Sequence, residues 1–346
     1  MATSIYDLVS PRLVAKRWNE NTKEREPFYG EALFSPKKQL GIDIDSITGN
    51  KPSPRPLNLS TFDSKVIPLS REAFEKITMR MPFFKNSYNL DETQRQELNK
   101  VVASGNQTYI DAVMNIYYND TDNLLANADI TREIERMMIL TTGNIAFENN
   151  GVAVAYDYGI TNKSTPNWST ASTADPVSDI ETFLDTVENA SGVRPTRLLM
   201  NSVTLNKIRK IDSVRLAILK DNSNVFVSKA QVISYLQSEL QVTIVIYNKG
   251  YKDISTGTFT KFVPDDVISV YPDGYIGEGV FGTTPEESDL MSGATSAQVS
   301  IVDTGVAITV TKETDPVNVA TKVSMIYLPT LNDPSSIGIM SVNFGD

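Results

Sequence analysis

Thr131-Arg-Glu-Ile-Glu-Arg-Met-Met-Ile-Leu140 lies at the centre of the most strongly helical region of the chain. Ile130, Ile134, Met137 and Met138 recur at spacings of three and four, and Ile145 and Phe147 continue the apolar pattern beyond this stretch. This spacing is typical of one face of an α-helix. We therefore predict one long helix near residues 129–147, within a mainly helical region that begins near residue 91.

Upstream of this region, two strand-like runs flank a proline-rich stretch. Leu40, Ile42, Ile44 and Ile47 alternate partly with polar residues, and a second apolar run covers residues 57–69. Between them lies Thr48-Gly-Asn-Lys-Pro-Ser-Pro-Arg-Pro56. Prolines at alternate positions are incompatible with a central strand. The pattern predicts a long exposed hairpin over residues 36–70, whose tip resists sheet pairing.

The first 35 residues carry scattered apolar side chains, including Trp18, with only a short helix-like spacing at Ile5, Leu8 and Val9. A segment of this kind cannot bury its aromatic residues alone. We expect an arm that packs on the body of the protein or on a neighbouring subunit.

Downstream, helical and strand-like patterns alternate irregularly. Asp175 as N-cap, Pro176 in the first turn and Gly192 as a stop predict a helix between them. Further helices are predicted at 203–219 and 229–240, and strands at 152–158, 196–201, 242–247 and 266–271, with strand-like sequence from residue 258 onward. This order predicts an α+β fold rather than an alternating doubly wound sheet.

The composition removes most catalytic chemistry, because the chain contains no Cys and no His. Disulfides, thiol nucleophiles, imidazole catalysis and Cys- or His-based zinc sites are therefore excluded. The net charge of −10 divides into +3 for residues 1–100 (16 basic, 13 acidic) and −13 for the remainder (16 basic, 29 acidic). Specific recognition of duplex DNA normally requires a concentrated basic face, so we do not expect it here.

Neither an export signal nor a membrane span is expected. Charged residues interrupt every apolar stretch in the first thirty positions, and no uncharged apolar run approaches the roughly 18 residues that a span needs. We expect a protein that is made and used in the cytosol.

Gly277-Glu-Gly279-Val-Phe-Gly282 satisfies the GxGxxG spacing of dinucleotide-binding loops. Such a loop must open directly into a helix whose N-terminus holds the pyrophosphate, whereas a strand-like region continues here. We interpret the glycines as part of a kinked strand.

Three carboxylate pairs and one lysine pair were considered as site residues. They are Asp43/Asp45, Asp265/Asp266, Glu286/Glu287 and Lys37/Lys38. The first carboxylate pair alternates with isoleucines and suits the solvated face of a hairpin, the other two adjoin prolines and suit turns, and the lysines suit a solvated surface. We predict no catalytic, cofactor-binding or metal-binding residues and no cofactor.

Short motifs spread along the chain carry a resemblance to a known family. They are Leu40-Gly-Ile-Asp-Ile-Asp45, Val66-Ile-Pro-Leu-Ser-Arg-Glu72, Thr196-Arg-Leu-Leu-Met-Asn-Ser202, the run 267–287 with Gly282-Thr-Thr-Pro-Glu-Glu287, Lys312-Glu-Thr-Asp-Pro316 and Met325-Ile-Tyr-Leu-Pro329. In this order they resemble the major capsid protein E family of tailed phages, the lambda-like group with the HK97-type capsid fold.

The resemblance implies an N-terminal arm (1–35), an extended loop (36–85), a peripheral domain with a spine helix (86–175), an axial domain (176–310) and C-terminal strands that return to the peripheral domain (311–346). It also implies hexamers and pentamers that close into an icosahedral shell around double-stranded DNA without sequence-specific binding. Scaffold, portal and decoration proteins would be the partners, the virion would be the location, and no enzymatic activity is expected. The Lys-Asn crosslink of some members is not predicted.

Three alternatives remain from the sequence. The same fold occurs in encapsulin-like nanocompartments, which package an enzyme in place of DNA. From a different class, an enzyme that depends on carboxylates or lysine is compatible with the residues present. A phage tail or adhesion protein is disfavoured by the helical middle and the lack of repeats.

Overall fold

The computed structural model describes residues 10–22, 25–48, 75–90, 92, 96–97, 100, 105–149, 151–219, 227–253, 256–293, 298–314 and 317–345. The helices are α2 (Pro11–Thr22), α4 (Gln107–Thr142), α5 (Pro176–Ser191), α6 (Ser202–Ile208), α7 (Asp212–Leu219), α8 (Lys229–Leu240) and α9 (Pro285–Ser292), with 3-10 helices η1 (Tyr29–Ala32) and η2 (Pro334–Ser336). The strands are β1 (Phe34–Lys38), β2 (Asp43–Thr48), β3 (Glu75–Arg80), β4 (Phe83–Leu90), β5 (Asn144–Asn149), β6 (Val152–Asp157), β7 (Lys163–Ser164), β8 (Arg197–Met200), β9 (Thr243–Ile246), β10 (Gly250–Lys252), β11 (Phe259–Lys261), β12 (Val267–Tyr271), β13 (Gly277–Phe281), β14 (Gln298–Val302), β15 (Val306–Thr314), β16 (Val317–Leu331) and β17 (Gly338–Ser341).

The described residues fall into two compact units, and each is built from separate stretches of the chain. The first unit draws on residues 1–44, 80–134 and 278–330, and the second on residues 45–79, 135–277 and 331–346. Helix α4 begins in the first unit and ends in the second. Neither unit is therefore a continuous piece of sequence. The five functional segments implied by the family resemblance stay a prediction.

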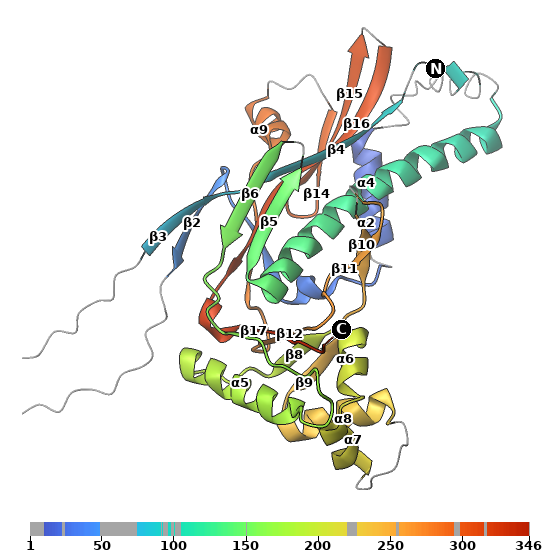
Figure 1. Ribbon diagram of the computed structural model, residues 1–346. Helices are drawn as coiled ribbons and strands as arrows, with labels where there is room; N and C mark the ends of the chain where they lie inside the picture. Colours follow the sequence, from blue (N-terminus) through green and yellow to red (C-terminus); the bar gives the residue numbers. More distant parts are fainter. Residues whose placement is uncertain are drawn as a thin grey trace, which may run out of the picture. The chain divides into compact units, whose positions relative to one another are not determined.

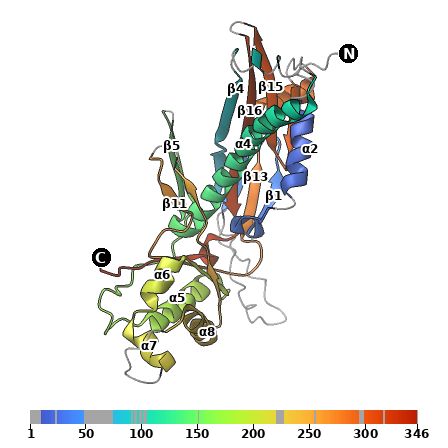
Figure 2. The ribbon, with the colours of Figure 1, turned by 90° about the vertical axis from the view of Figure 1, so that its right-hand side faces the viewer.

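The first unit is built on a six-stranded sheet in the order β1-β13-β16-β15-β14, with β4 also paired to β16. Strand β16 pairs antiparallel with β15 over residues 306–314 and with β4 over residues 83–90. Figure 2 shows α4 and α2 alongside these strands. The core between helices and sheet includes Val14, Trp18, Leu124, Leu125, Phe281, Ile308, Val323 and Tyr327.

Helix α2 lies within the predicted arm, and it packs on the body of its own chain. Val14 and Trp18 are each 1% exposed and belong to the core of the first unit. Arg17 adds an ion pair to Asp122 of α4 at 3.5 Å. Of the two locations predicted for the arm, residues 10–22 take the one on the body. The spacing at Ile5, Leu8 and Val9 lies outside the described residues.

The long helix predicted near 129–147 exists as α4, but both of its predicted ends are wrong. It begins at Gln107 and ends at Thr142, a length of 36 residues. Gly143 follows with φ +81°, and its N–H donates to the Ile139 carbonyl (2.9 Å), which closes the last turn. Ile145 and Phe147 lie on β5, paired with β6. A two-residue spacing fits a strand better than a helix, and the glycine marks the change.

The second unit is built on a five-stranded sheet in the order β7-β17-β12-β8-β9, accompanied by helices α5 to α8 (Figure 1). Strand β12 pairs antiparallel with β17 and β8, whereas β8 pairs parallel with β9. Its core includes Ile180, Phe183, Leu184, Val187, Leu198, Leu205, Val232, Leu236, Ile268 and Met340.

The predicted helix signals at 175–192 are confirmed. The Asp175 side chain accepts a hydrogen bond from the Ser178 N–H (3.3 Å), Pro176 is the first residue of α5, and Gly192 ends the helix with φ +73°. Helix α8 has the predicted bounds, and Ser228 and Gln231 form a capping box at its start. The predicted strands at 152–158, 196–201, 242–247 and 266–271 are confirmed as β6, β8, β9 and β12.

The single helix predicted at 203–219 is wrong, because the structure has α6 and α7 there. The N–H groups of Lys210 and Ile211 bond to the carbonyls of Lys207 and Ile208, three residues back, at 3.1 Å each. Such bonds tighten the last turn of a helix. Ile211 is 2% exposed. The burial of Ile211 holds the turn between α6 and α7. The apolar spacing of the sequence continues across this turn and therefore does not reveal it.

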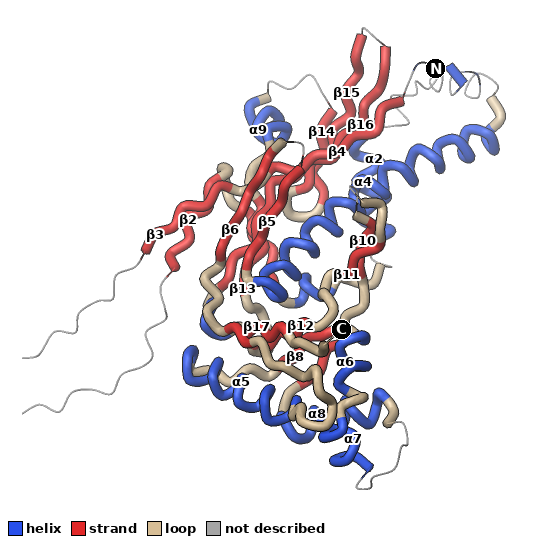
Figure 3. The backbone as a smooth tube through the Cα atoms, in the orientation of Figure 1, coloured by secondary structure: helices blue, strands red, loops and turns tan. Residues whose placement is uncertain are grey.

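Two further predictions concern the hairpin and the strand-rich end. Strands β2 and β3 form a two-stranded sheet, so the base of the hairpin is confirmed (Figure 3), and the strand that pairs with β2 is β3 at residues 75–80. The proline-rich tip and the run 57–69 lie outside the described residues.

Strands dominate after residue 258, but 285–292 form helix α9, because Thr284 caps it by accepting from the Glu287 N–H (3.3 Å).

Candidate functional site

The glycines of the GxGxxG motif provide close packing within the first unit. Gly277 and Gly279 lie in β13, and Gly282 follows it directly. A Cβ atom at Gly279 would lie 2.7 Å from the Tyr327 hydroxyl, and one at Gly282 would lie 2.6 Å from the Ile326 side chain. The expectation that no helix follows is wrong, since α9 begins at Pro285. The kinked-strand interpretation agrees with glycines that make room for neighbouring side chains.

Glu286 and Glu287 are not turn residues, as the sequence suggested, but occupy the first turn of α9 and are nearly buried (9% and 7% exposed). Carboxylates are favourable at the positive end of a helix. Glu286 binds Lys322 and accepts a hydrogen bond from the Ser324 hydroxyl (2.9 Å). Burial opposes ionisation, but these hydrogen bonds outweigh it and lower the pKa of Glu286. The pair joins α9 to the sheet.

The two lysines considered as site residues have different environments on β1. Lys38 Nζ lies 2.5 Å from a Glu287 oxygen and 2.9 Å from the Gly282 carbonyl, with 28% of its side chain exposed. Lys37 pairs with Glu278 at 2.7 Å, with 53% of its side chain exposed. Only Lys37 matches the solvated surface predicted for both, because Lys38 neutralises a nearly buried carboxylate.

Asp43 and Asp45 were assigned to the solvated face of the hairpin. Asp43 is exposed on β2 and lies 3.5 Å from Arg80 Nε, which agrees with that assignment. The side chain of Asp45 lies outside the described residues.

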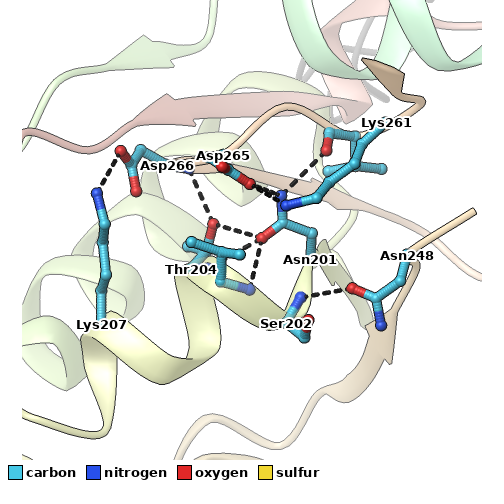
Figure 4. A network of polar contacts seen from close by, with 10 residues as sticks. Asn201, Ser202, Thr204, Lys207, Asn248, Lys261, Asp265 and Asp266 are labelled. Carbon is cyan, nitrogen blue, oxygen red and sulfur yellow. Dashed lines mark hydrogen bonds and ion pairs between the residues drawn. The ribbon is translucent and has the colours of Figure 1, made fainter. Parts of the chain in front are cut away.

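Asp265 and Asp266 belong to a polar network of the second unit that is centred on Asn201 (Figure 4). Asn201 is fully buried and caps α6, because its Oδ1 accepts from the N–H groups of Val203 and Thr204 at 2.9 Å each. Its Nδ2 donates to the Val263 carbonyl (3.1 Å) and to Asp265 Oδ1 (2.6 Å). One amide therefore connects the start of α6 to the turn that precedes β12.

Two lysines complete this network. Lys261 donates to Asp265 at 2.7 Å, and Lys207 donates to Asp266 at 2.8 Å. The hydrogen bonds from Lys261 and then Asn201 lower the pKa of Asp265 despite partial burial. Both aspartates lie in the predicted turn. Because each is paired with a lysine, the arrangement serves to hold the turn against α6.

The sequence analysis missed a set of buried charges on α4. Arg132 donates to Asp129 and, at 3.2 Å, to Asp303, and the Gly30 N–H donates to Glu133 Oε1 at 3.0 Å. Burial raises the pKa of Asp129, although Arg132 opposes the shift. Five charged residues lie within the eight positions 129–136, so charge is dense on this part of α4. This local density of charged residues was the sequence feature from which the buried charges could have been predicted.

Glu135 is a different case, because neither of its carboxylate oxygens has a hydrogen-bond partner within the described parts of the chain. It is fully buried, and burial raises its pKa well above the usual value while Arg136 partly opposes the shift. An unpaired buried carboxylate is costly to a fold.

The described ranges contain no group of three or more acidic, Cys or His side chains placed to hold a metal ion. Within them, no helix combines the length and apolar character that crossing a bilayer requires.

Exposed apolar side chains form the other class of candidate site. Large examples are Leu13, Leu40, Ile42, Phe83, Tyr88, Val152, Val193, Leu216, Phe259, Tyr275, Leu290 and Met291. They occur in both units. Isolated exposed apolar residues are common on soluble proteins, but they also supply the contacts of protein interfaces.

Solved structures of phage proteins share the fold of this chain. The chain is similar to a putative capsid protein of an Escherichia coli CFT073 prophage, with 15% identity, coverage of 96% of this chain and 99% of that one, and a TM-score of 0.58. It is similar to a capsid chain of cyanophage A-1(L), with 10% identity, 92% coverage of each chain and a TM-score of 0.51. A phage-related protein from Bordetella bronchiseptica RB50 matches with 12% identity, 96% and 97% coverage and a TM-score of 0.50.

These likenesses confirm the predicted HK97-like capsid fold. Among curated proteins, none matches the chain. The family model described as phage major capsid protein E matches residues 14–342, which include almost all of both compact units. The sequence resemblance is thus confirmed, and the chain belongs to the phage major capsid protein E family.

Proposed function

We propose that copies of this protein assemble as hexamers and pentamers into an icosahedral shell that encloses packaged double-stranded DNA. The observation that carries the proposal is the family match over residues 14–342. As a member of this family, the protein is a capsid shell protein and a component of the phage virion. The subunit arrangement and the contents of the shell are the proposed part.

The partners follow from the same role. A shell of this kind forms with a scaffold and a portal, and decoration proteins can bind its outer surface. We place assembly in the host cytoplasm. We also propose that the protein has no enzymatic activity, since its work is done by interfaces between copies.

The charge of the chain is compatible with enclosing DNA without binding it tightly. A net charge of −10 gives the protein no overall attraction for phosphates. Tight binding would require many basic contacts to the backbone, with a strong dependence on salt. A capsid shell that binds DNA only weakly would let the duplex move into it during packaging.

Expression of the protein alone, and together with the proteins encoded beside it in the phage genome, tests the proposal. The products would be separated by size and imaged by negative-stain electron microscopy. We expect closed shells, rings or sheets, and shells isolated from infected cells should contain nuclease-protected DNA. A species that stays monomeric or dimeric with all its neighbours present would contradict the shell role. Shells filled with one cargo enzyme would favour the encapsulin-like alternative.

A deletion in the hairpin tests whether this segment is needed for assembly. We expect shortening of residues 46–58 to abolish closed particles while α5 to α8 remain folded, because the described core of the second unit is drawn from residues 168–342. Circular dichroism and limited proteolysis would check the fold. Normal shells from the shortened chain would remove the hairpin from the proposed mechanism.

A further inference from the structure

Helix α5 presents an acidic surface to solvent. Its buried face consists of Pro176, Ile180, Phe183, Leu184 and Val187. The acidic residues lie outside this face. Residues 175–194 contain five carboxylates and one guanidinium, a net charge of −4, from Asp175, Asp179, Glu181, Asp185, Glu188 and Arg194. We call this surface the acidic face.

Most of these carboxylates already have partners, but one does not. Asp185 and Glu188 share Arg194, at 2.5 and 2.9 Å, and Asp179 accepts from the Trp168 indole at 2.6 Å. Glu181 is exposed and has no ion-pair partner among the described residues. It lies four residues before Asp185, and like charges at this spacing destabilise a helix. The acidic face therefore has uncompensated charge.

The turn between α6 and α7 presents the opposite charge. Residues 207–215 contain four cations and one carboxylate, a net charge of +3, from Lys207, Arg209, Lys210, Asp212 and Arg215. Lys207 is paired with Asp266, and Arg215 with Asp212. Arg209 and the exposed Lys210 make no ion pair with another residue that the structure describes. We call this surface the basic face.

Each face also borders an exposed apolar side chain. Val193, directly after α5, is 49% exposed, and Leu216 of α7 is 39% exposed. In Figure 1, α5 lies on the left of this unit, and α6 and α7 lie on its right. One copy thus carries two complementary surfaces at different places, each combining unpaired charge with an apolar residue. Apolar contact surrounded by complementary charge is the usual anatomy of a protein interface.

We infer that the acidic face of one copy binds the basic face of the next copy, in a head-to-tail contact that repeats around a ring. The inference rests on the proposed function and specifies which surfaces of the second unit join neighbouring subunits. A contact between two different surfaces generates a closed ring when the rotation between copies permits it. Long charged side chains tolerate small changes of angle. The same two faces would therefore serve rings of five and of six subunits.

Charge reversal tests this inference in the full-length protein. The variants are Glu181→Lys on the acidic face, Lys210→Glu on the basic face and the double exchange E181K/K210E. Lys229→Glu, at the exposed start of α8 and outside both faces, is the matched control. Shell yield would be measured by sedimentation and electron microscopy, and circular dichroism would check that each variant folds.

We expect each single reversal to lower shell yield at least tenfold, the double exchange to restore at least half of it, and the control to assemble like the wild type. Normal assembly of both single variants would overturn the inference and leave the proposed function intact. A double exchange that folds but does not recover, or a control that fails equally, would also overturn it. Failure of the wild type to assemble with its phage neighbours would instead contradict the proposed function.

Discussion

Removing the Asn201 amide is expected to release the start of α6. Asn201→Ala deletes a helix cap, which costs about 1 kcal/mol. It also leaves the buried Val263 carbonyl without its donor, which adds about 1–3 kcal/mol. The expected total loss is about 3 kcal/mol. Native-state hydrogen exchange of the α6 amides measures it as a lower free energy of local opening.

Asn201→Asp separates the two halves of this interaction. The cap is retained, because an aspartate oxygen also accepts from the α6 amides. The atom that replaces Asn201 Nδ2, however, is an oxygen. It faces Asp265 Oδ1, which lies 2.6 Å from Nδ2 in the wild type. Two carboxylates this close raise the pKa of one of them. Because a raised folded-state pKa destabilises at neutral pH and not in acid, the variant should approach the wild type in urea unfolding as the pH falls toward 4.

A neighbouring residue supplies the control for both variants. The Ser202 hydroxyl makes no hydrogen bond within the described residues, so Ser202→Ala should change the opening free energy by less than about 0.5 kcal/mol. A loss below about 1 kcal/mol for the alanine variant would refute the reasoning, given the two costs worked out above. An aspartate variant as stable as the wild type at pH 7 would do the same.

Three further predictions concern buried charge and close packing. Glu135→Gln should raise the urea midpoint at pH 8, and the gain should shrink toward pH 5, because the raised pKa of Glu135 lets it protonate as the pH falls; an equal gain at both pH values would contradict this. Lys38→Met should lower the free energy of unfolding by about 1–2 kcal/mol, because it leaves Glu287 unpaired. Lys37→Met should lower it by under about 0.5 kcal/mol, and equal losses for the two variants would contradict this prediction. Gly279→Ala should lower the thermal midpoint by the equivalent of about 1–3 kcal/mol, since its Cβ would collide with a buried tyrosine, and an unchanged midpoint would disprove the packing role.

Local signals in the sequence predicted the elements that depend on a few adjacent residues. Asp175, Pro176 and Gly192 define the ends of α5 because capping and left-handed backbone are properties of single positions. The predicted bounds of helix α8 also agree with the structure, in which Ser228 caps the start of the helix. The predicted C-terminal end of α4 is wrong because Ile145 lies seven residues after Met138 and therefore continues a helical spacing. The φ of Gly143 and the pairing with β6 identify the strand.

Contacts between residues that are far apart in the sequence could not be predicted from local patterns. Glu287 adjoins Pro285 and suggests a turn, and nothing nearby in sequence indicates that Lys38, 249 positions away, neutralises it. The Asn201 network likewise joins residues about 60 positions apart. The absence of a conventional catalytic set was inferred from composition, whereas the two faces of opposite charge required knowledge of which sides of α5 and α6 are buried.

The strand order of the five-stranded sheet constrains when this sheet becomes complete during synthesis. Strand β17, residues 338–341, lies between β7 and β12, whose sequences precede it by more than sixty residues. While the ribosome has not yet reached residue 341, β7 lacks its neighbour and β12 has an open edge. Such late, long-range pairing slows folding. A translation product interrupted before β17 would therefore carry an unfinished five-stranded sheet.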